Sequence, residues 1–181
     1  MSPSAALVGS YGLQATINNT TPMYVWDDSP NAESHYRARF YFDPNSITMA
    51  DGNAHYIFMG IGSDGTSVFQ LTFRFSGGNY QIQLRQKDDN NLQTSTAWVT
   101  MSDAPHFIEM EWWAATTAGA NDGGVNLWID GVQSGSLGNL DNDAQRIDRV
   151  RLGAVTGIDV GTLGTYYFDA FESRRETYIG P

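Results

Sequence analysis

Residues 67–86 read SVFQLTFRFSGGNYQIQLRQ and decide the fold class of this chain. Apolar and polar side chains alternate on both sides of Gly77-Gly78, which is the pattern of two half-buried β-strands joined by a tight turn. Phe69, Leu71 and Phe73 fall on one face of the first strand, and Gln70, Thr72 and Arg74 fall on the other. We therefore expect a β-hairpin with one apolar face and one polar face.

The same alternation recurs along the whole chain, and no window of a dozen residues keeps the apolar spacing of a helix free of Gly and Pro. The residues between 137 and 147 form the longest stretch without a strand pattern, so we expect a loop or a short helical turn there. The fold class predicted is all-β, a two-sheet antiparallel jelly-roll sandwich that forms a single domain over residues 1–181. Strands are expected at residues 12–17, 23–26, 34–42, 54–61, 67–75, 79–86, 97–99, 106–114, 125–129, 150–154 and 165–171.

Charge and composition exclude several functions. Ten Lys and Arg oppose twenty Asp and Glu, and the formal charge of -10 disfavours nucleic acid and anionic membranes as partners. The absence of cysteine excludes thiol catalysis and cysteine-ligated zinc. No apolar run approaches the roughly 20 residues of a membrane-spanning helix, so no membrane insertion is expected. The lysine-poor, turn-rich composition favours an extracellular or cell-surface domain excised from a larger protein.

The polar faces of the predicted strands carry groups that bind sugars. Amide, guanidinium and carboxylate groups pair with sugar hydroxyls, and indole rings stack on the apolar side of a pyranose. We expect these side chains to converge on one shared groove, the alternative being an ordinary solvated outer sheet. The candidate carbohydrate-binding residues are Arg74, Gln81, Gln83, Arg85, Glu109, Glu111, Trp113 and Trp128.

Three segments together resemble a known superfamily. They are SHYRARFYFD at residues 34–43, VNLWIDG at residues 125–131 and GTYYFDAF at residues 164–171. In this order they resemble the concanavalin A-like lectin and glucanase superfamily, and within it the laminin G-like domains. The resemblance implies a curved jelly roll, carbohydrate binding on or beside the concave sheet, and a structural calcium ion at a sheet edge.

The enzymes of that superfamily carry motifs that this sequence lacks. Retaining glucanases need a nucleophile and an acid/base on one strand, but Glu109 and Glu111 are followed by Trp113 and Ala114 where a third carboxylate would stand. Alginate lyases use a Gln-Ile-His strand, whereas residues 81–83 read Gln-Ile-Gln. We therefore expect binding without cleavage, with a divergent hydrolase or lyase as the alternative, the latter through Arg74 and Tyr80.

The three histidines predict no catalytic or zinc site. His35, His55 and His106 are scattered along the chain, and no Gly-x-Ser-x-Gly segment is present. A Ser-His-Asp arrangement is therefore not expected, and His106 is predicted to satisfy a hydrogen bond at a strand edge.

Asp169 lies on an otherwise aromatic strand, where a carboxylate needs compensation. The resemblance implies a calcium ion held by Asp169, by backbone carbonyls and by Asp27; a salt bridge to Arg174 or Arg175, or simple exposure, is the alternative. The Asp141-Asn142-Asp143 loop also has metal-binding residue types but lacks the spacing of a calcium-binding helix-loop-helix.

The sequence thus predicts a non-catalytic, lectin-like module with a polysaccharide or glycan as its partner and calcium as a structural cofactor. A structural or adhesive surface module, which self-associates or contacts neighbouring domains, is the second alternative. The identity of the glycan and the oligomeric state stay open.

Overall fold

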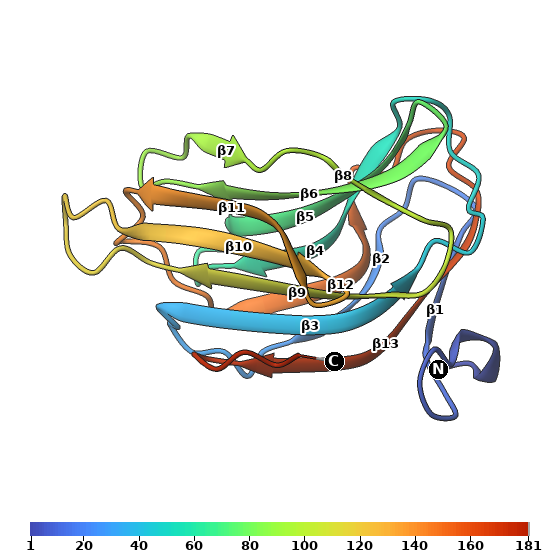
Figure 1. Cartoon of the computed structure of the whole chain (residues 1–181), viewed down its shortest axis with the longest axis horizontal. Helices are drawn as coiled ribbons and strands as arrows, with labels where there is room; N and C mark the ends of the chain where they lie inside the picture. Colours follow the sequence, from blue (N-terminus) through green and yellow to red (C-terminus); the bar gives the residue numbers. More distant parts are fainter. Residues whose placement is uncertain (181) are drawn as a thin grey trace.

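The computed structural model describes residues 1–180 and consists of two antiparallel sheets packed face to face (Figure 1). A short 3-10 helix, Pro3–Ala5, precedes the strands. The six-stranded sheet has the order β1 (Leu13–Ile17), β13 (Gly164–Arg174), β3 (His35–Asp43), β9 (His106–Trp113), β10 (Gly123–Ile129) and β11 (Val132–Leu140). The seven-stranded sheet has the order β2 (Met23–Asp27), β12 (Arg149–Thr156), β4 (Ala54–Ile61), β5 (Ser67–Ser76), β6 (Asn79–Lys87) and β7 (Gln93–Ser95), and β8 (Val99–Met101) also pairs with β6. The predicted all-β, two-sheet antiparallel jelly roll is confirmed.

An aromatic layer between the two sheets forms the core. Phe42 of one sheet packs edge-on against Phe73 of the other, with their ring centroids 5.1 Å apart. Phe40 stacks on Phe58 and Phe69 stacks on Trp112 across the same layer. All of these side chains are fully buried, and burying each one stabilises the fold by roughly 2–3 kcal/mol.

Two strands, β11 and β7, were not predicted from the sequence. The prediction of a loop or helical turn from residue 137 is wrong over its first residues, because β11 continues to Leu140. This strand has the sequence VQSGSLGNL and lies at the edge of its sheet, where partial exposure of both faces removes the alternation that would reveal it. The other missed strand, β7, has only three residues, and the strand predicted at 97–99 is found at 99–101 as β8.

Strand β2 forms an edge of the seven-stranded sheet, paired only with β12. Met23, Val25 and Trp26 of this strand are all exposed. No helix among residues 1–180 is both long and apolar enough to cross a membrane.

His55 is buried inside the aromatic layer. Its ring stacks on Tyr166, and Nε2 lies 3.2 Å from the Tyr166 hydroxyl. Burial lowers the pKa of His55 to about 4, with a smaller opposing effect from Asp159. The folded protein therefore holds this imidazole neutral, whereas the unfolded chain protonates it below about pH 6.5.

This difference predicts a pH-dependent loss of stability. Between about pH 6.5 and about pH 4, His55 is protonated in the unfolded chain and neutral in the folded protein. The free energy of unfolding therefore falls by about 1.4 kcal/mol for each unit by which the pH is lowered in this range. Urea unfolding at pH 6.5 and pH 5 should show about 2 kcal/mol of this loss in the wild type and lack it in His55→Gln. An equal loss in both proteins would contradict the assignment to His55.

Candidate functional site

The sequence-predicted carbohydrate-binding residues fall on two different sheets. The strands β5 and β6 carry Arg74, Gln81, Gln83 and Arg85, whereas β9 and β10 carry Glu109, Glu111, Trp113 and Trp128. The outer faces of the two sheets of a sandwich point in opposite directions, so the expectation of one shared groove is wrong. The alternation of apolar and polar residues shows which side chains point away from the core, but it does not show to which sheet a strand belongs.

The outer surface of the seven-stranded sheet concentrates arginine and aromatic side chains. We call it the arginine face. The register aligns Arg74 with Gln81, Thr72 with Gln83, and Gln70 with Arg85 across β5 and β6. The arginine face comprises Tyr56, Thr72, Arg74, Gln81, Gln83, Arg85, Trp98 and Arg151.

Each arginine of this face is held by uncharged neighbours. The Arg74 guanidinium lies 3.8 Å from the centroid of the Trp98 ring and donates from Nε to the Gln81 side-chain oxygen at 2.7 Å. Arg85 donates to the Tyr56 hydroxyl at 3.2 Å, and Arg151 lies 4.7 Å from the centroid of the Tyr24 ring. The guanidinium groups are thereby oriented without being neutralised.

The charges of the arginine face have no carboxylate partner among residues 1–180. Neither Arg74, Arg85 nor Arg151 lies within salt-bridge distance of an Asp or Glu of that part of the chain, although the protein has twice as many acidic as basic residues. The arginines that do form such pairs are Arg37, Arg39, Arg149, Arg174 and Arg175. A local excess of positive charge therefore occurs on one face of an acidic protein.

Two buried acceptors lie side by side in the middle of the arginine face. The Gln83 amide donates to the backbone carbonyl of Thr96 at 2.7 Å, but its side-chain oxygen has no protein partner. The hydroxyl of Thr72, the residue paired with Gln83 in the register, is also unpaired. Buried polar atoms are normally hydrogen-bonded, so these two oxygens lack the partners that such atoms usually have.

The outer face of the six-stranded sheet has the opposite electrostatic character, because its charges are paired internally. Arg37 bonds to Glu109 at 3.0 Å and to Glu111 at 2.7 Å. The segment that follows β13 crosses this face, and the backbone N–H groups of Ile179 and Gly180 both donate to the Glu109 carboxylate. Glu109 is fully buried, so it is a structural anchor and is not exposed to bind a ligand.

Glu111 and Trp113 line an open cavity of about 630 Å³ on this sheet, together with His35, Asn126 and Glu176. Burial raises the pKa of Glu111, but hydrogen bonds from His35 and Asn126 and the charge of Arg37 outweigh burial and lower it below the ordinary value. The Trp113 indole N–H donates to the carbonyl of Asp122 at 2.8 Å. Trp128 lies outside the cavity, half-buried against Tyr178.

The alternative catalytic assignments fit this geometry poorly. Glu109 is covered, so the pair Glu109 and Glu111 cannot both reach a glycosidic bond. Tyr80 donates its hydroxyl to the carbonyl of Ile47 and packs against the core, on the opposite face of β6 from Arg85.

Asp169 is compensated by the backbone. One of its oxygens accepts hydrogen bonds from the N–H groups of Leu7 and Val8, each at 2.9 Å, and the other accepts from Ala170. Arg174 and Arg175 pair with Glu172 and Glu33 instead. Asp27 lies on the other sheet and accepts from Ser29. The physical reason for placing calcium between Asp169 and Asp27 is therefore removed.

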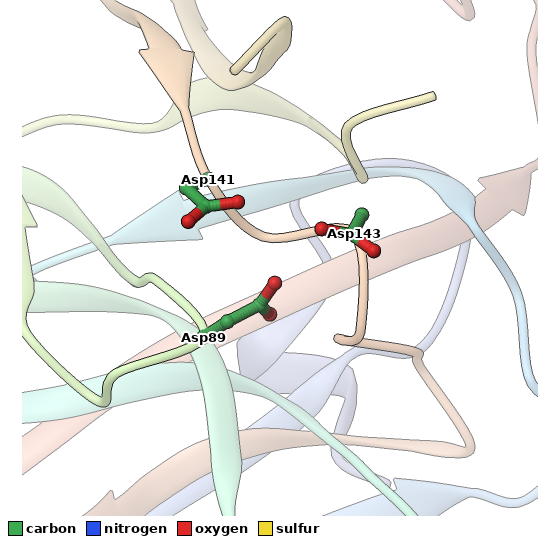
Figure 2. Close-up of side chains that lie close together, drawn as sticks. All are labelled: Asp89, Asp141 and Asp143. Carbon is green, nitrogen blue, oxygen red and sulfur yellow. The ribbon is translucent and has the colours of Figure 1, made fainter. Parts of the chain in front are cut away.

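Another group of carboxylates does come together. Asp89, Asp141 and Asp143 converge from two loops, with ligand oxygens within 4.8 Å of one another (Figure 2). No Lys, Arg or His of residues 1–180 lies within salt-bridge distance of these three side chains. Asp141 and Asp143 belong to the loop that was noted in the sequence for its metal-binding residue types. Asp89 is distant in the sequence, so only the structure shows that it joins them.

The three histidines have different surroundings. His35 pairs with Glu111, and His55 is in the core. His106 bonds to both Ser102 and Asp130, so the prediction against a Ser-His-Asp arrangement is wrong. That prediction relied on a motif for a strand-to-helix turn, and here the serine lies in the connection between β8 and β9.

The buried carboxylate predicts a marked loss of stability on mutation. Glu109→Ala removes one of the two carboxylate partners of Arg37 and leaves two backbone N–H groups without their acceptor, so we expect urea unfolding to show a loss of about 3 kcal/mol or more. The control is Glu172→Ala, which removes an exposed partner of Arg39 and Arg174 and should cost about 1 kcal/mol or less. Similar losses in the two variants would contradict the anchoring role of Glu109.

The sequence matches no protein-family model and no curated protein. Among solved structures, the chain is similar to the receptor-binding domain of botulinum neurotoxin mosaic serotype C/D, with a TM-score of 0.64 and 12% identity over 96% of this chain and 41% of that one. It is also similar to the alginate lyase Aly36B, with a TM-score of 0.63 and 12% identity over 94% of this chain and 84% of the lyase.

A third similar structure is the ligand-binding domain of botulinum neurotoxin serotype D in complex with N-acetylneuraminic acid, with a TM-score of 0.55 and 14% identity over 93% of this chain and 37% of that one. The chain thus spans about two fifths of the length of the neurotoxin domains that it matches. At these identities the likeness is one of fold, and it supports the jelly-roll sandwich.

Proposed function

We propose that this protein binds an acidic polysaccharide through the arginine face and does not cleave it. The observation that carries the proposal is the set of three half-buried guanidinium groups, those of Arg74, Arg85 and Arg151, which have no carboxylate partner among residues 1–180. A uronate carboxylate supplies the missing charge, and guanidinium matches its two oxygens with two parallel donors.

The remaining side chains of the arginine face suit the rest of a sugar. Gln81, which is half-buried beside Arg74, adds an amide group of the kind that pairs with sugar hydroxyls. Trp98, which is half-buried beside Arg74, offers an aromatic ring at the edge of the surface. Neighbouring strands repeat such groups side by side, and this arrangement fits an extended chain better than a single small ligand.

The structural comparisons agree with this ligand class. Aly36B is named for alginate, a polymer of uronates, and the serotype D neurotoxin domain was solved with a carboxylated sugar. A polysaccharide partner of this kind also suits the extracellular or cell-surface location that we propose from the composition.

The proposal predicts selective and salt-sensitive binding. Affinity electrophoresis and calorimetry should show binding to alginate or polygalacturonate and none to dextran, with the affinity falling as ionic strength rises. Replacing Arg85 or Arg74 with Ala removes a charged hydrogen-bonding group, so the affinity should fall about tenfold or more.

Matched controls separate the arginine face from the rest of the surface. Arg149→Ala removes an arginine already paired with Asp28, and Trp113→Ala and Trp128→Ala alter the opposite sheet, so all three should keep their affinity. Loss of binding in the tryptophan variants but not in the arginine variants would place the site on the other face and contradict the proposal.

A lyase is the second candidate function, favoured by one contact. The Tyr56 hydroxyl, a group able to transfer a proton, lies 3.2 Å from Arg85 Nη1 on the arginine face. Unsaturated uronate products, followed by their ultraviolet absorbance, would contradict binding without cleavage if they formed with the wild type and disappeared in Tyr56→Phe.

Calcium binding stays a prediction from the sequence, and Asp89, Asp141 and Asp143 are the residues that fit it. Three oxygen-donating carboxylates without a cationic partner among residues 1–180 match the preference of this ion, which would remove their mutual repulsion. The melting temperature should therefore be higher in calcium than in EDTA, and Asp143→Asn should reduce the difference. An unchanged melting temperature after EDTA treatment would contradict the prediction.

A further inference from the structure

Ser102, His106 and Asp130 meet where the β8–β9 connection approaches the turn between β10 and β11. The Ser102 Oγ lies 2.8 Å from His106 Nε2, and His106 Nδ1 lies 2.6 Å from Asp130 Oδ2. Both distances are within the range of a nucleophile, a base and a carboxylate that orients the base. Of the three histidines, only His106 contacts both a hydroxyl and a carboxylate.

The aspartate determines which nitrogen of the imidazole carries the proton. An ionised carboxylate can only accept, so Nδ1 of a neutral His106 must donate to Asp130. The other nitrogen, Nε2, is then an acceptor, and the Ser102 hydroxyl donates to it. This is the tautomer that a general base needs in order to remove a proton from a serine.

The aspartate is itself held in place. The second carboxylate oxygen of Asp130, Oδ1, accepts a hydrogen bond from the backbone N–H of Phe107 at 3.0 Å. The backbone N–H of Asp130 donates in turn to the Phe107 carbonyl at 2.9 Å. Asp130 has a φ of 51°, which is the left-handed conformation required at the start of the Asp130-Gly131 turn. The β-turn thereby fixes the carboxylate opposite the first residue of β9.

All three side chains have surface that solvent can reach. Ser102 is exposed, and the side chains of His106 and Asp130 keep 14% and 47% of their surface exposed. The backbone N–H groups of Asp103 and Ala104, which directly follow the serine, donate to no protein acceptor within residues 1–180. A backbone N–H without a protein acceptor is the kind of group that stabilises a negative charge developing on a substrate oxygen.

We propose that Ser102, His106 and Asp130 form a second, catalytic site that hydrolyses small esters. The three residues line none of the cavities at His35, Gly62, Leu13, Val25 or Thr16, so no described pocket holds a long acyl chain beside them. An acetyl ester, whose acyl group needs no such pocket, is therefore the substrate class of the proposal. This site is independent of the arginine face.

The reaction balances with water as the only co-reactant. The Ser102 Oγ attacks the ester carbonyl carbon while its proton passes to His106 Nε2, and the same proton then passes to the departing alkoxide as the carbon–oxygen bond breaks. Water attacks the resulting acyl-serine and gives a proton to Nε2. That proton returns to Ser102 Oγ as the carboxylic acid leaves, so ester and water yield acid and alcohol.

The full chain can be tested with p-nitrophenyl acetate and a fluorophosphonate probe. We expect release of p-nitrophenol above the buffer rate and covalent labelling of Ser102, located by peptide mass spectrometry. Ser102→Ala should abolish both signals, and Asp130→Asn should lower the rate about 10²- to 10⁴-fold because the tautomer is no longer fixed. Melting curves check that each variant is folded.

Ser29→Ala is the matched control, because the Ser29 hydroxyl bonds directly to a carboxylate, that of Asp27, whereas the Ser102 hydroxyl bonds to an imidazole. It should leave both signals unchanged. The proposal is overturned if folded wild-type protein gives no label and no turnover, or if Ser102→Ala keeps the wild-type signals. It is overturned equally if the acetyl or phosphonyl group is found only on other residues.

Discussion

The contact between aromatic side chains of the two sheets is the interaction on which the rest of the structure depends. Phe42 meets Phe73, and Phe69 meets Trp112, across the interior. Such pairs contribute about 0.5–1.5 kcal/mol each beyond the burial of their area. Because strand side chains alternate, fixing these rings inside also fixes Arg74 and Arg85 on the outer face of one sheet and Glu109 and Glu111 on the opposite sheet.

The two outer faces distribute charge in different ways. On the six-stranded sheet, Arg37 is neutralised by Glu109 and Glu111, and the segment after β13 covers the first of these carboxylates. On the seven-stranded sheet, the arginines are oriented by Trp98, Tyr56 and Tyr24 and keep their charge. Aromatic and amide partners hold a guanidinium in place without satisfying its need for an anion. This difference is why we propose the seven-stranded sheet as the receptor for an acidic chain.

Local sequence pattern predicted the strands well because alternation is a property of neighbouring residues. It identified β5 and β6 and their polar sides correctly. It could not assign strands to sheets, because that depends on contacts between distant segments, and so it merged two faces into one groove. The same limit explains why the backbone donors of Asp169, which come from Leu7 and Val8, were not predicted. It also explains why the carboxylate partner of His106 was missed, since that residue lies 24 positions further along the chain. A usable signal did exist for the latter: an Asp-Gly turn, Asp130-Gly131, follows β10, the strand that pairs with the one His106 begins.

The edge strand β2 has a consequence for handling the protein. Its outer row of peptide groups has no neighbouring strand, and Met23, Val25 and Trp26 beside it are exposed. Natural sheets protect such edges with lysine, proline or a bulge, because a bare apolar edge recruits another chain. The sequence contains a single lysine, Lys87, which lies on β6 rather than on this edge. We therefore expect β2 to be the edge at which two copies of the chain would pair in concentrated solution, and a charge engineered at Val25 should oppose that pairing.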